Sequence, residues 1–237
     1  MILIHAGMHK TGSSSIQSTL AKLNETQIDY LPWRVDNHSG LFTLMFHDAP
    51  ETTGGFKRAG SSAQSVRELA DRWGARATAL MEKRAAAGNQ RPLVFSAEAI
   101  SSAPEDAVQR MADYMRRYDP DIRVLAYVRP PISFMSSAFQ QRSKFGLPHN
   151  LAEMRVWPRY RARFEKLDRI FGREAVTLKL FQRDLFAGGD VVLDFAREAG
   201  VTLDPSEVVR ANESMSLEAI ALLYVQSQYG ARFGPRD

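Results

Sequence analysis

Near its N-terminus the chain reads Ile2-Leu3-Ile4-His5-Ala6-Gly7-Met8-His9-Lys10-Thr11-Gly12-Ser13-Ser14-Ser15-Ile16-Gln17. The apolar run Ile2–Ala6 predicts a buried strand, and a helical segment over Ser13–Leu23 follows it after a turn with two glycines. A strand, a glycine-rich turn and a helix in this order form an anion-binding cradle, because the N–H groups of the turn and the positive end of the helix dipole face one concavity. We therefore expect a phosphate or sulfate group to bind here.

The spacing of Gly7 and Gly12 is that of nucleotide triphosphatase loops, in which a lysine follows the second glycine. Here Ser13 occupies that position, and the lysine lies inside the loop at Lys10. A plain connection with a serine N-cap explains Ser13 alone. It does not explain a lysine, two glycines and the hydroxyls of Ser13–Ser15 in one turn.

The rest of the chain continues the alternation of strands and helices. Further strands are predicted at Leu93–Ser96, Val124–Val128 and Val176–Phe181, and helices at Ile132–Ser143 and Asp190–Ala199. This alternation predicts an α/β fold of three layers, with a central, mainly parallel sheet flanked by helices. Ligands of such folds bind at the carboxyl ends of the strands.

The 237 residues are expected to form a single domain, 1–237. Residues 32–91 are interpreted as an insert on the acceptor side, which begins with an irregular loop at Asp48–Ser62. An amphipathic helix follows, whose apolar side holds Val66, Leu69, Trp73, Leu80 and Met81.

Composition excludes several classes of protein. The 31 Lys and Arg residues exceed the 27 Asp and Glu residues by too little to require nucleic acid as a partner. There is no cysteine, no signal-peptide core and no apolar stretch long enough to span a membrane, so we expect a cytoplasmic protein. No metal-ligand spacing is present, so no metal is expected. The sequence does not indicate an oligomeric state.

A second anion contact is predicted at the end of the third strand. Arg129 stands there, followed by Pro130 and Pro131, and Ser137 lies further along the next helix, with Ser136 as an adjacent alternative. A guanidinium and a hydroxyl in this arrangement can share one phosphate, although an arginine after a strand is often only a surface ion pair.

The segment His9–Gln17 resembles the 5′-phosphosulfate loop of the sulfotransferase superfamily, whose members use 3′-phosphoadenosine 5′-phosphosulfate (PAPS). The match to the family pattern Lys-[Ser/Thr]-Gly-[Ser/Thr]-[Ser/Thr] is complete over Lys10–Ser14, and the surrounding residues are most similar to the bacterial carbohydrate-type branch. The spacing of Arg129, Pro131 and Ser137 is similar to the 3′-phosphate element of the family. The resemblance weakens over Gly189–Phe195 and 212–216.

The resemblance implies a PAPS-dependent O-sulfotransferase that acts on a hydroxyl of a carbohydrate or glycoconjugate and releases 3′-phosphoadenosine 5′-phosphate (PAP). The residues it assigns to the cofactor are Lys10, Thr11, Gly12, Ser13, Ser14, Ser15, Arg129 and Ser137. Arg210 and Asn212 are further candidates near the 3′-phosphate or adenine, or belong to a surface loop.

Three residues are candidates for the chemistry. Lys10 suits the bridging oxygen, where charge develops during transfer. Glu98 follows the second strand and is the best-placed base, since related carbohydrate sulfotransferases use a glutamate there; the alternative is a carboxylate that stabilises a helix N-terminus. His9 lies in the loop itself, where it either contacts substrate or orients loop carbonyls.

Other interpretations stay open. One is a P-loop kinase or NTPase, disfavoured by Ser13 at the lysine position, and another is a noncatalytic nucleotide-binding protein on the same fold. The arginine-rich segment Trp157–Gly172 is either a basic face for an anionic acceptor or a solvated helix.

Overall fold

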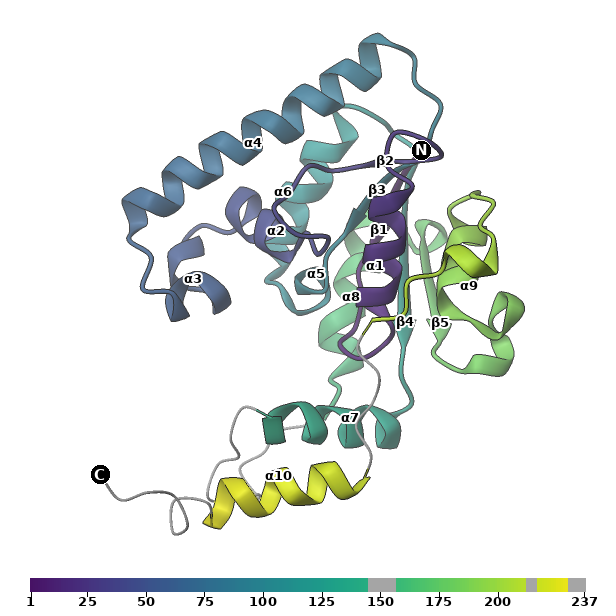
Figure 1. The fold of residues 1–237 in the computed structure, drawn as a ribbon. Coiled ribbons are helices and arrows are strands. Elements are labelled where there is room, and N and C mark those ends of the chain that lie inside the picture. The colour runs from purple at the N-terminus through teal and green to yellow at the C-terminus, as the bar shows by residue number, and fades with distance from the viewer. Residues whose placement is uncertain (145–156, 212–216, 230–237) are drawn as a thin grey trace.

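The computed structural model describes residues 1–144, 157–211 and 217–229. Its centre is a five-stranded sheet in the order β2-β3-β1-β4-β5, and every strand pair is parallel. The strands are β1 (Ile2–His5), β2 (Asp29–Tyr30), β3 (Leu93–Ser96), β4 (Ile122–Val128) and β5 (Val176–Leu180). The predicted α/β fold with a parallel sheet between helical layers is confirmed (Figure 1).

Side chains on the two faces of the sheet enter two separate cores. Ile2 and Ile4 of β1 face one core, to which α2 (Ser39–Phe46), α6 (Glu105–Arg116) and α8 (Tyr160–Phe171) contribute. Leu3 faces the other, which α1 (Ser13–Lys22) and α9 (Val191–Glu198) cover. Burial on both faces explains the continuous apolar run of β1, because neither side of a central parallel strand meets water.

Strand β2 was not predicted, since it has only two residues and begins with a carboxylate. Asp29 is nevertheless buried, and it accepts hydrogen bonds from Arg84, from Asn89 (2.6 Å) and from Arg91 (3.1 Å). These donors compensate for the lost hydration of the carboxylate, so a charged residue is tolerated at this edge of the sheet.

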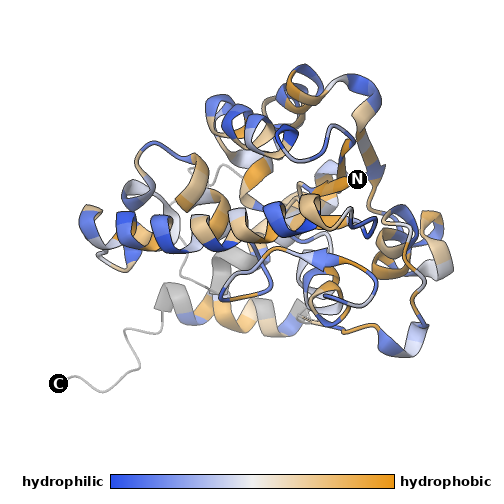
Figure 2. Cartoon of the chain, turned by 90° about the horizontal axis from the view of Figure 1, so that it is seen from above, coloured by the Kyte–Doolittle hydropathy of each residue, from blue (hydrophilic) through white to orange (hydrophobic). Residues whose placement is uncertain are grey.

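The expected irregular loop at Asp48–Ser62 is partly helical, because it contains a 3-10 turn, Pro50–Thr52, and helix α3, Gly54–Arg58. Helix α4 (Ala63–Ala86) follows, and the Ser62 side chain caps its N-terminus. Figure 2 shows how hydrophobic and hydrophilic residues alternate along this long helix. Ala77 and Met81 of α4 pack into the same core as α2, so residues 32–91 continue the main core.

The remaining helices lie toward the carboxyl edge of the sheet. They are α5 (Ala99–Ser102), α7 (Pro131–Lys144) and α10 (Leu217–Tyr229), and short 3-10 turns occur at Arg173–Ala175, Arg183–Leu185, Ala187–Gly189 and Pro205–Glu207. Figure 1 shows α7 and α10 together beyond the ends of the strands. Among the described residues, no helix has the length and apolar character needed to cross a bilayer.

A buried polar network underlies the carboxyl ends of β1 and β3. Ser96 contacts the Nδ1 atom of His5 at 2.8 Å and accepts a hydrogen bond from Gln17 at 3.1 Å. The backbone N–H of Ser96 donates to Nδ1 of His38 at 3.1 Å. Burial lowers the pKa of His5 to about 4 and that of His38 to about 3, so both rings are neutral in the folded protein near pH 7.

We predict that the folded state loses stability as the pH falls below 6.5. An unfolded histidine takes up a proton near pH 6.5, whereas the buried rings stay neutral until about pH 4 or lower. Over that interval each histidine lowers the free energy of unfolding by about 1.4 kcal/mol per pH unit. Urea unfolding at pH 7.5 and pH 5.0 measures this loss, and His5→Gln should reduce the difference by the share of one histidine. An unchanged pH dependence in His5→Gln would show that burial of His5 does not cause it.

Candidate functional site

The turn between β1 and α1 is the predicted cradle, and its backbone has the curvature that an anion site requires. Lys10 (φ 65°) and Gly12 (φ 76°) both adopt the left-handed conformation. Gly12 forms the N-cap of α1, and its carbonyl accepts the first helical hydrogen bond, from Ile16 at 3.0 Å. The N–H groups of Ser13–Ser15, in the first turn of α1, have no partner within the helix and are therefore available to an anion.

Glycine is required at both ends of this loop because the packing is close. A Cβ atom at Gly12 would lie 2.6 Å from Cγ1 of Val191, the first residue of α9. A Cβ atom at Gly7 would lie 2.7 Å from the Ser13 hydroxyl oxygen. The loop is thus fitted between α9 and its own helix.

The hydroxyls of the loop do not all face the same way. Thr11 is buried and donates to the carbonyl of Met8 at 2.7 Å, so its side chain stabilises the turn. Ser13 is also buried, 3.5 Å from the Thr11 hydroxyl, although it lines the cavity described below. Ser15 contacts Ala211, whose N–H donates to it at 3.0 Å. Ser14 is partly exposed on the cavity wall.

The segment 208–211 crosses the first turns of α1. Besides the contact to Ser15, the N–H of Val209 donates to the hydroxyl of Thr19 at 3.0 Å. Arg210, in the same segment, lies 3.7 Å from the carboxylate of Asp190. Of the two candidates predicted here, Arg210 lines the cavity, and Asn212 lies outside the described residues.

Arg129 and Ser137 reach the same cavity from the other side. The guanidinium of Arg129 lies over the ring of Phe181, 5.2 Å from its centroid, and burial lowers the pKa of Arg129. Its Nε atom is buried and has no hydrogen-bond partner among the described residues. Ser137 is buried at the cavity wall, whereas Ser136 is exposed and donates to the carbonyl of Ile132. The geometry therefore favours Ser137 over Ser136.

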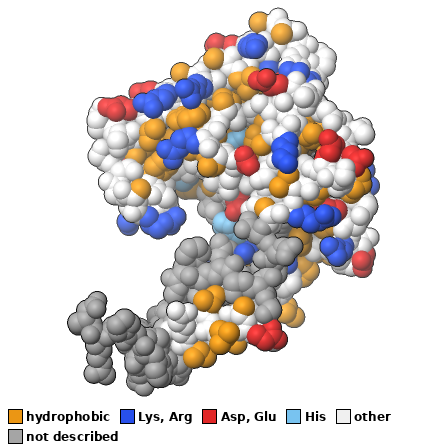
Figure 3. All heavy atoms as spheres, viewed as in Figure 1, with side chains coloured by type: hydrophobic (Ala, Val, Ile, Leu, Met, Phe, Trp, Pro, Cys, Tyr) orange, Lys and Arg blue, Asp and Glu red, His pale blue; other side chains and the backbone are white. Residues whose placement is uncertain are grey.

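These groups surround one cavity of about 610 Å³ at the carboxyl ends of β1 and β4. In Figure 3, viewed as in Figure 1, side chains of Lys or Arg, of Asp or Glu and of His come together at the lower end of the upper body. The ionisable residues that line the cavity are His9, Lys10, Glu98, Arg129, Arg183, Asp190 and Arg210. Four of them are lysine or arginine and two are carboxylates, so the lining favours an anionic ligand.

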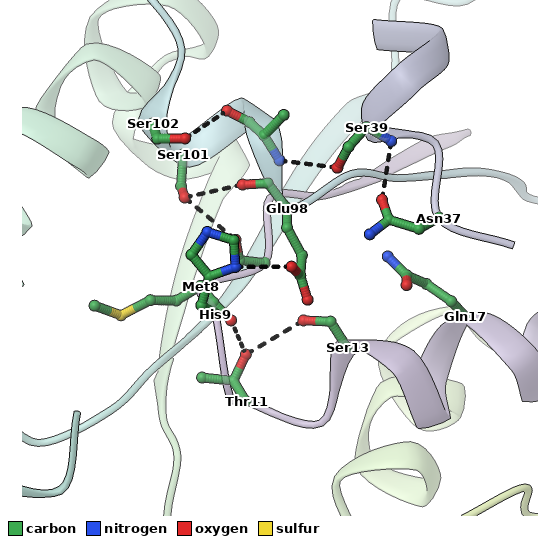
Figure 4. A network of polar contacts seen from close by, with 12 residues as sticks. Met8, His9, Thr11, Ser13, Gln17, Asn37, Ser39, Glu98, Ser101 and Ser102 are labelled. Atoms are coloured by element: carbon green, nitrogen blue, oxygen red, sulfur yellow. Dashed lines mark hydrogen bonds and ion pairs between the residues drawn. The ribbon is translucent and has the colours of Figure 1, made fainter. Parts of the chain in front are cut away.

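The two candidate proton acceptors are hydrogen-bonded to one another (Figure 4). Nδ1 of His9 lies 2.8 Å from Oε2 of Glu98. Burial of the Glu98 carboxyl acts to raise its pKa, but the hydrogen bond from His9 and the neighbouring Ser13 hydroxyl outweigh burial. The pKa of Glu98 therefore lies below its ordinary value. Glu98 also precedes α5, as the helix-terminus alternative requires, but its side chain caps no N–H of that helix.

Helix α5 is anchored on both sides, which fixes Glu98 relative to the loop. The Ser101 hydroxyl donates to the carbonyl of Gly7 at 3.2 Å. The buried ammonium of Lys166, from α8, donates to the carbonyls of Ser101 (3.0 Å) and Ala103 (2.5 Å) at the C-terminal end of α5. Burial lowers the pKa of Lys166 to about 8. Sequence reasoning missed this role, because Lys166 lies in the arginine-rich segment Trp157–Gly172 and no local pattern distinguishes it from the basic residues around it.

The arginine-rich segment Trp157–Gly172 forms helix α8 only from Tyr160, and two of its arginines pair with carboxylates. Arg169 pairs with Glu105 at 2.6 Å, and Arg161 pairs with Glu165 at 3.5 Å. Neither residue lines the cavity. The contacts therefore support the interpretation as a solvated and packed helix rather than a basic face.

Arg183 and Asp190 were not predicted as site residues. They precede α9, where the sequence offers only glycines and an N-cap aspartate as signals. Their position depends on a buried carboxylate, Asp194, which accepts hydrogen bonds from Tyr127 (2.9 Å) and Lys179 (2.5 Å) and thereby ties α9 to the sheet. Residues brought to a cavity by tertiary packing of this kind carry no local pattern.

No family model matches the chain, and no curated protein matches it either. Among solved structures, the chain is similar to the sulfotransferase from Alicyclobacillus acidocaldarius, with a TM-score of 0.53 and 18% sequence identity. The likeness covers 99% of this chain and 96% of the other. At this identity it shows a shared fold, the sulfotransferase fold, and it does not distinguish a carbohydrate-type branch.

We predict that Lys166→Met lowers the free energy of unfolding by about 1–3 kcal/mol, because it leaves two buried carbonyls without a donor. Lys22→Met, at the exposed last turn of α1, is the matched control and should change stability by less than about 0.5 kcal/mol. Urea unfolding of both variants at pH 7 measures the difference. Equal, small effects would mean that Lys166 does not hold α5.

Proposed function

We propose that the protein is a sulfotransferase that moves the sulfuryl group of PAPS to a hydroxyl of a carbohydrate or glycoconjugate. The observation that carries the proposal is the single cavity that joins the loop at Lys10–Ser15 to Arg129 and Ser137. In sequence, these two elements resemble the 5′-phosphosulfate and 3′-phosphate contacts of sulfotransferases. The shared fold with a known sulfotransferase supports the same proposal.

The residues present fit PAPS as a ligand. The Nε atom of Arg129 is buried without a partner among the described residues, and an unsatisfied donor of this kind fits a site that receives an anion. The left-handed turn at Lys10 and Gly12 supplies a concavity of N–H groups that a Cβ atom at Gly12 would disturb. In this proposal Lys10 and the loop hold the 5′-phosphosulfate, and Arg129 with Ser137 holds the 3′-phosphate.

When bound, PAPS supplies an electrophilic sulfur and a phosphate leaving group. The task of the protein is then to position an acceptor hydroxyl, take its proton and stabilise charge on the leaving oxygen. Lys10 lines the cavity within the loop and supplies the positive charge. His9 and Glu98, joined by a hydrogen bond at the cavity, supply the proton acceptor.

The acceptor is proposed to lie beside residues 32–91, which connect β2 to β3. Asn37 and Ser39, from this segment, lie near Glu98 (Figure 4), and Ser39 accepts a hydrogen bond from the N–H of Ala99 at 3.1 Å. A sulfate-transfer screen with labelled PAPS over sugars, lipids and phenols identifies the acceptor class.

A P-loop kinase or NTPase is the rival enzyme. Ser13, at the position of the NTPase lysine, is buried beside Thr11, and the loop lysine stands at Lys10 instead. Calorimetry with PAP and with ATP·Mg²⁺ separates the two: the proposal expects tighter binding of PAP, and tighter ATP·Mg²⁺ would overturn it. A noncatalytic protein on this fold would bind PAP and transfer sulfate to none of the acceptors.

We predict that Lys10→Ala lowers turnover by ~10²–10³ and weakens PAP binding much less, because charge on the leaving oxygen is largest in the transition state. Transfer rates and PAP calorimetry give the two values. Lys10→Gly is the matched control for backbone strain, since Lys10 has a positive φ that glycine adopts freely. It should lose the same turnover but be more stable than Lys10→Ala by about 1 kcal/mol. Unchanged turnover in both variants would remove Lys10 from the mechanism.

For Arg129→Ala we expect PAP to bind about 10–100-fold more weakly, as a charge-assisted contact of about 1.5–3 kcal/mol is lost. Adenosine 5′-phosphosulfate, which lacks the 3′-phosphate, should bind almost unchanged. Arg123→Ala is the control on the same strand, because Arg123 is exposed and pairs with Asp121 at 3.2 Å. If Arg129→Ala weakened both ligands equally, the contact would belong elsewhere on the nucleotide.

A further inference from the structure

The hydrogen bond between His9 and Glu98 joins the ends of two neighbouring strands. His9 follows β1, Glu98 follows β3, and the register of these parallel strands pairs His5 with Ser96. The two side chains therefore meet at one edge of the sheet, with Nδ1 of His9 at 2.8 Å from Oε2 of Glu98 (Figure 4).

We infer that His9, through its Nε2 atom, accepts the proton of the acceptor hydroxyl, and that Glu98 is a positioning residue that fixes the orientation and tautomer of the ring. The inference rests on the proposed function. From the sequence, Glu98 is the best-placed base; in this inference His9 accepts the proton and Glu98 orients His9.

The hydrogen bond determines which ring nitrogen is available. An ionised carboxylate has no proton to donate, so the proton in this bond belongs to Nδ1 of His9. The neutral ring then carries its lone pair on Nε2, for which no contact with a described residue is found. The same arrangement orients histidine in catalytic triads, where the carboxylate holds the ring and does not itself become protonated.

Exposure also favours His9. Its side chain is 49% exposed, whereas that of Glu98 is 18% exposed beneath it. A hydroxyl that enters the cavity from solvent meets the ring first. The proton can afterwards leave to water directly, without passing through the interior.

The charges around the pair lead to the same assignment. Glu98 faces His9 and the buried ring of His5, and its pKa is lowered, which makes it a weaker proton acceptor. Lys10 is next to His9 in the loop, and Arg129, Arg183, Asp190 and Arg210 line the rest of the cavity. An ionised Glu98 stabilises the imidazolium that forms on His9 against the positive charges of the lysine and the three arginines.

In the transfer step, the acceptor oxygen forms a bond to sulfur as the bond from sulfur to the 5′-phosphate oxygen breaks. The electron pair of the broken bond remains on the phosphate. The proton of the acceptor hydroxyl passes to Nε2 of His9. No oxidant, reductant or metal takes part in the balance.

The first test uses the protein without any donor and reads the tautomer directly. Spectra of ¹⁵N-histidine-labelled protein at pH 8, with the His9 signals identified by their loss in His9→Gln, should show Nδ1 protonated and Nε2 unprotonated. Glu98→Ala should shift the population toward the Nε2–H tautomer. Glu105→Ala, which removes an exposed carboxylate paired with Arg169, is the control and should leave the His9 signals unchanged. A wild-type ring protonated mainly at Nε2 would overturn the inference.

The second test is chemical rescue. His9→Ala should bind PAP within a few-fold of the wild type, lose ~10²–10⁴ in transfer rate and recover part of it with added imidazole. Near-normal transfer by His9→Ala would refute the inference, as would rescue of Glu98→Ala by formate when imidazole fails to rescue His9→Ala. Failure of the proposed function is a separate result: the wild type itself would then bind no PAP or transfer sulfate to no acceptor, while the tautomer of His9 is still read in the first test.

Discussion

The site depends on the reversal of the chain between β1 and α1. Two residues in the left-handed conformation, Lys10 and Gly12, place the N–H groups of the loop on its concave side and leave them without partners in the helix. A lysine in this conformation is strained, since a Cβ atom disfavours positive φ. The surrounding packing maintains this left-handed conformation, and the conformation sets the path of the backbone from which the Lys10 side chain extends.

The loop is held from three directions, and each contact also brings a functional group to the cavity. Helix α9 packs on Gly12 through Val191 and carries Asp190 at its N-cap. Helix α5 bonds Gly7 through Ser101, and Glu98 precedes it. The segment 208–211 bonds α1 and carries Arg210. The protein's own contacts hold the cradle in place, and groups fixed in this way are the condition for electrostatic stabilisation of a transition state.

Much of the fold could be predicted from the sequence, because the strands of a covered parallel sheet are short, continuous apolar runs that alternate with helical segments. Strand β2 could not, since Asp29 is buried only through donors that lie far away along the chain, such as Arg84 and Arg91. In the site, a local pattern indicated the loop and Arg129. The contact of Ser15 with Ala211 and the anchoring role of Lys166 depend on tertiary packing, which no local spacing encodes.

In the proposed complex, one nucleotide with phosphates at its 5′ and 3′ positions spans this cavity, from the loop to Arg129. A crystal structure of the protein with PAP tests it most directly. The account predicts the 5′-phosphate within hydrogen-bond distance of the N–H groups of residues 10–15 and the 3′-phosphate on Arg129 and Ser137. PAP bound in the reverse direction, or outside this cavity, would contradict it.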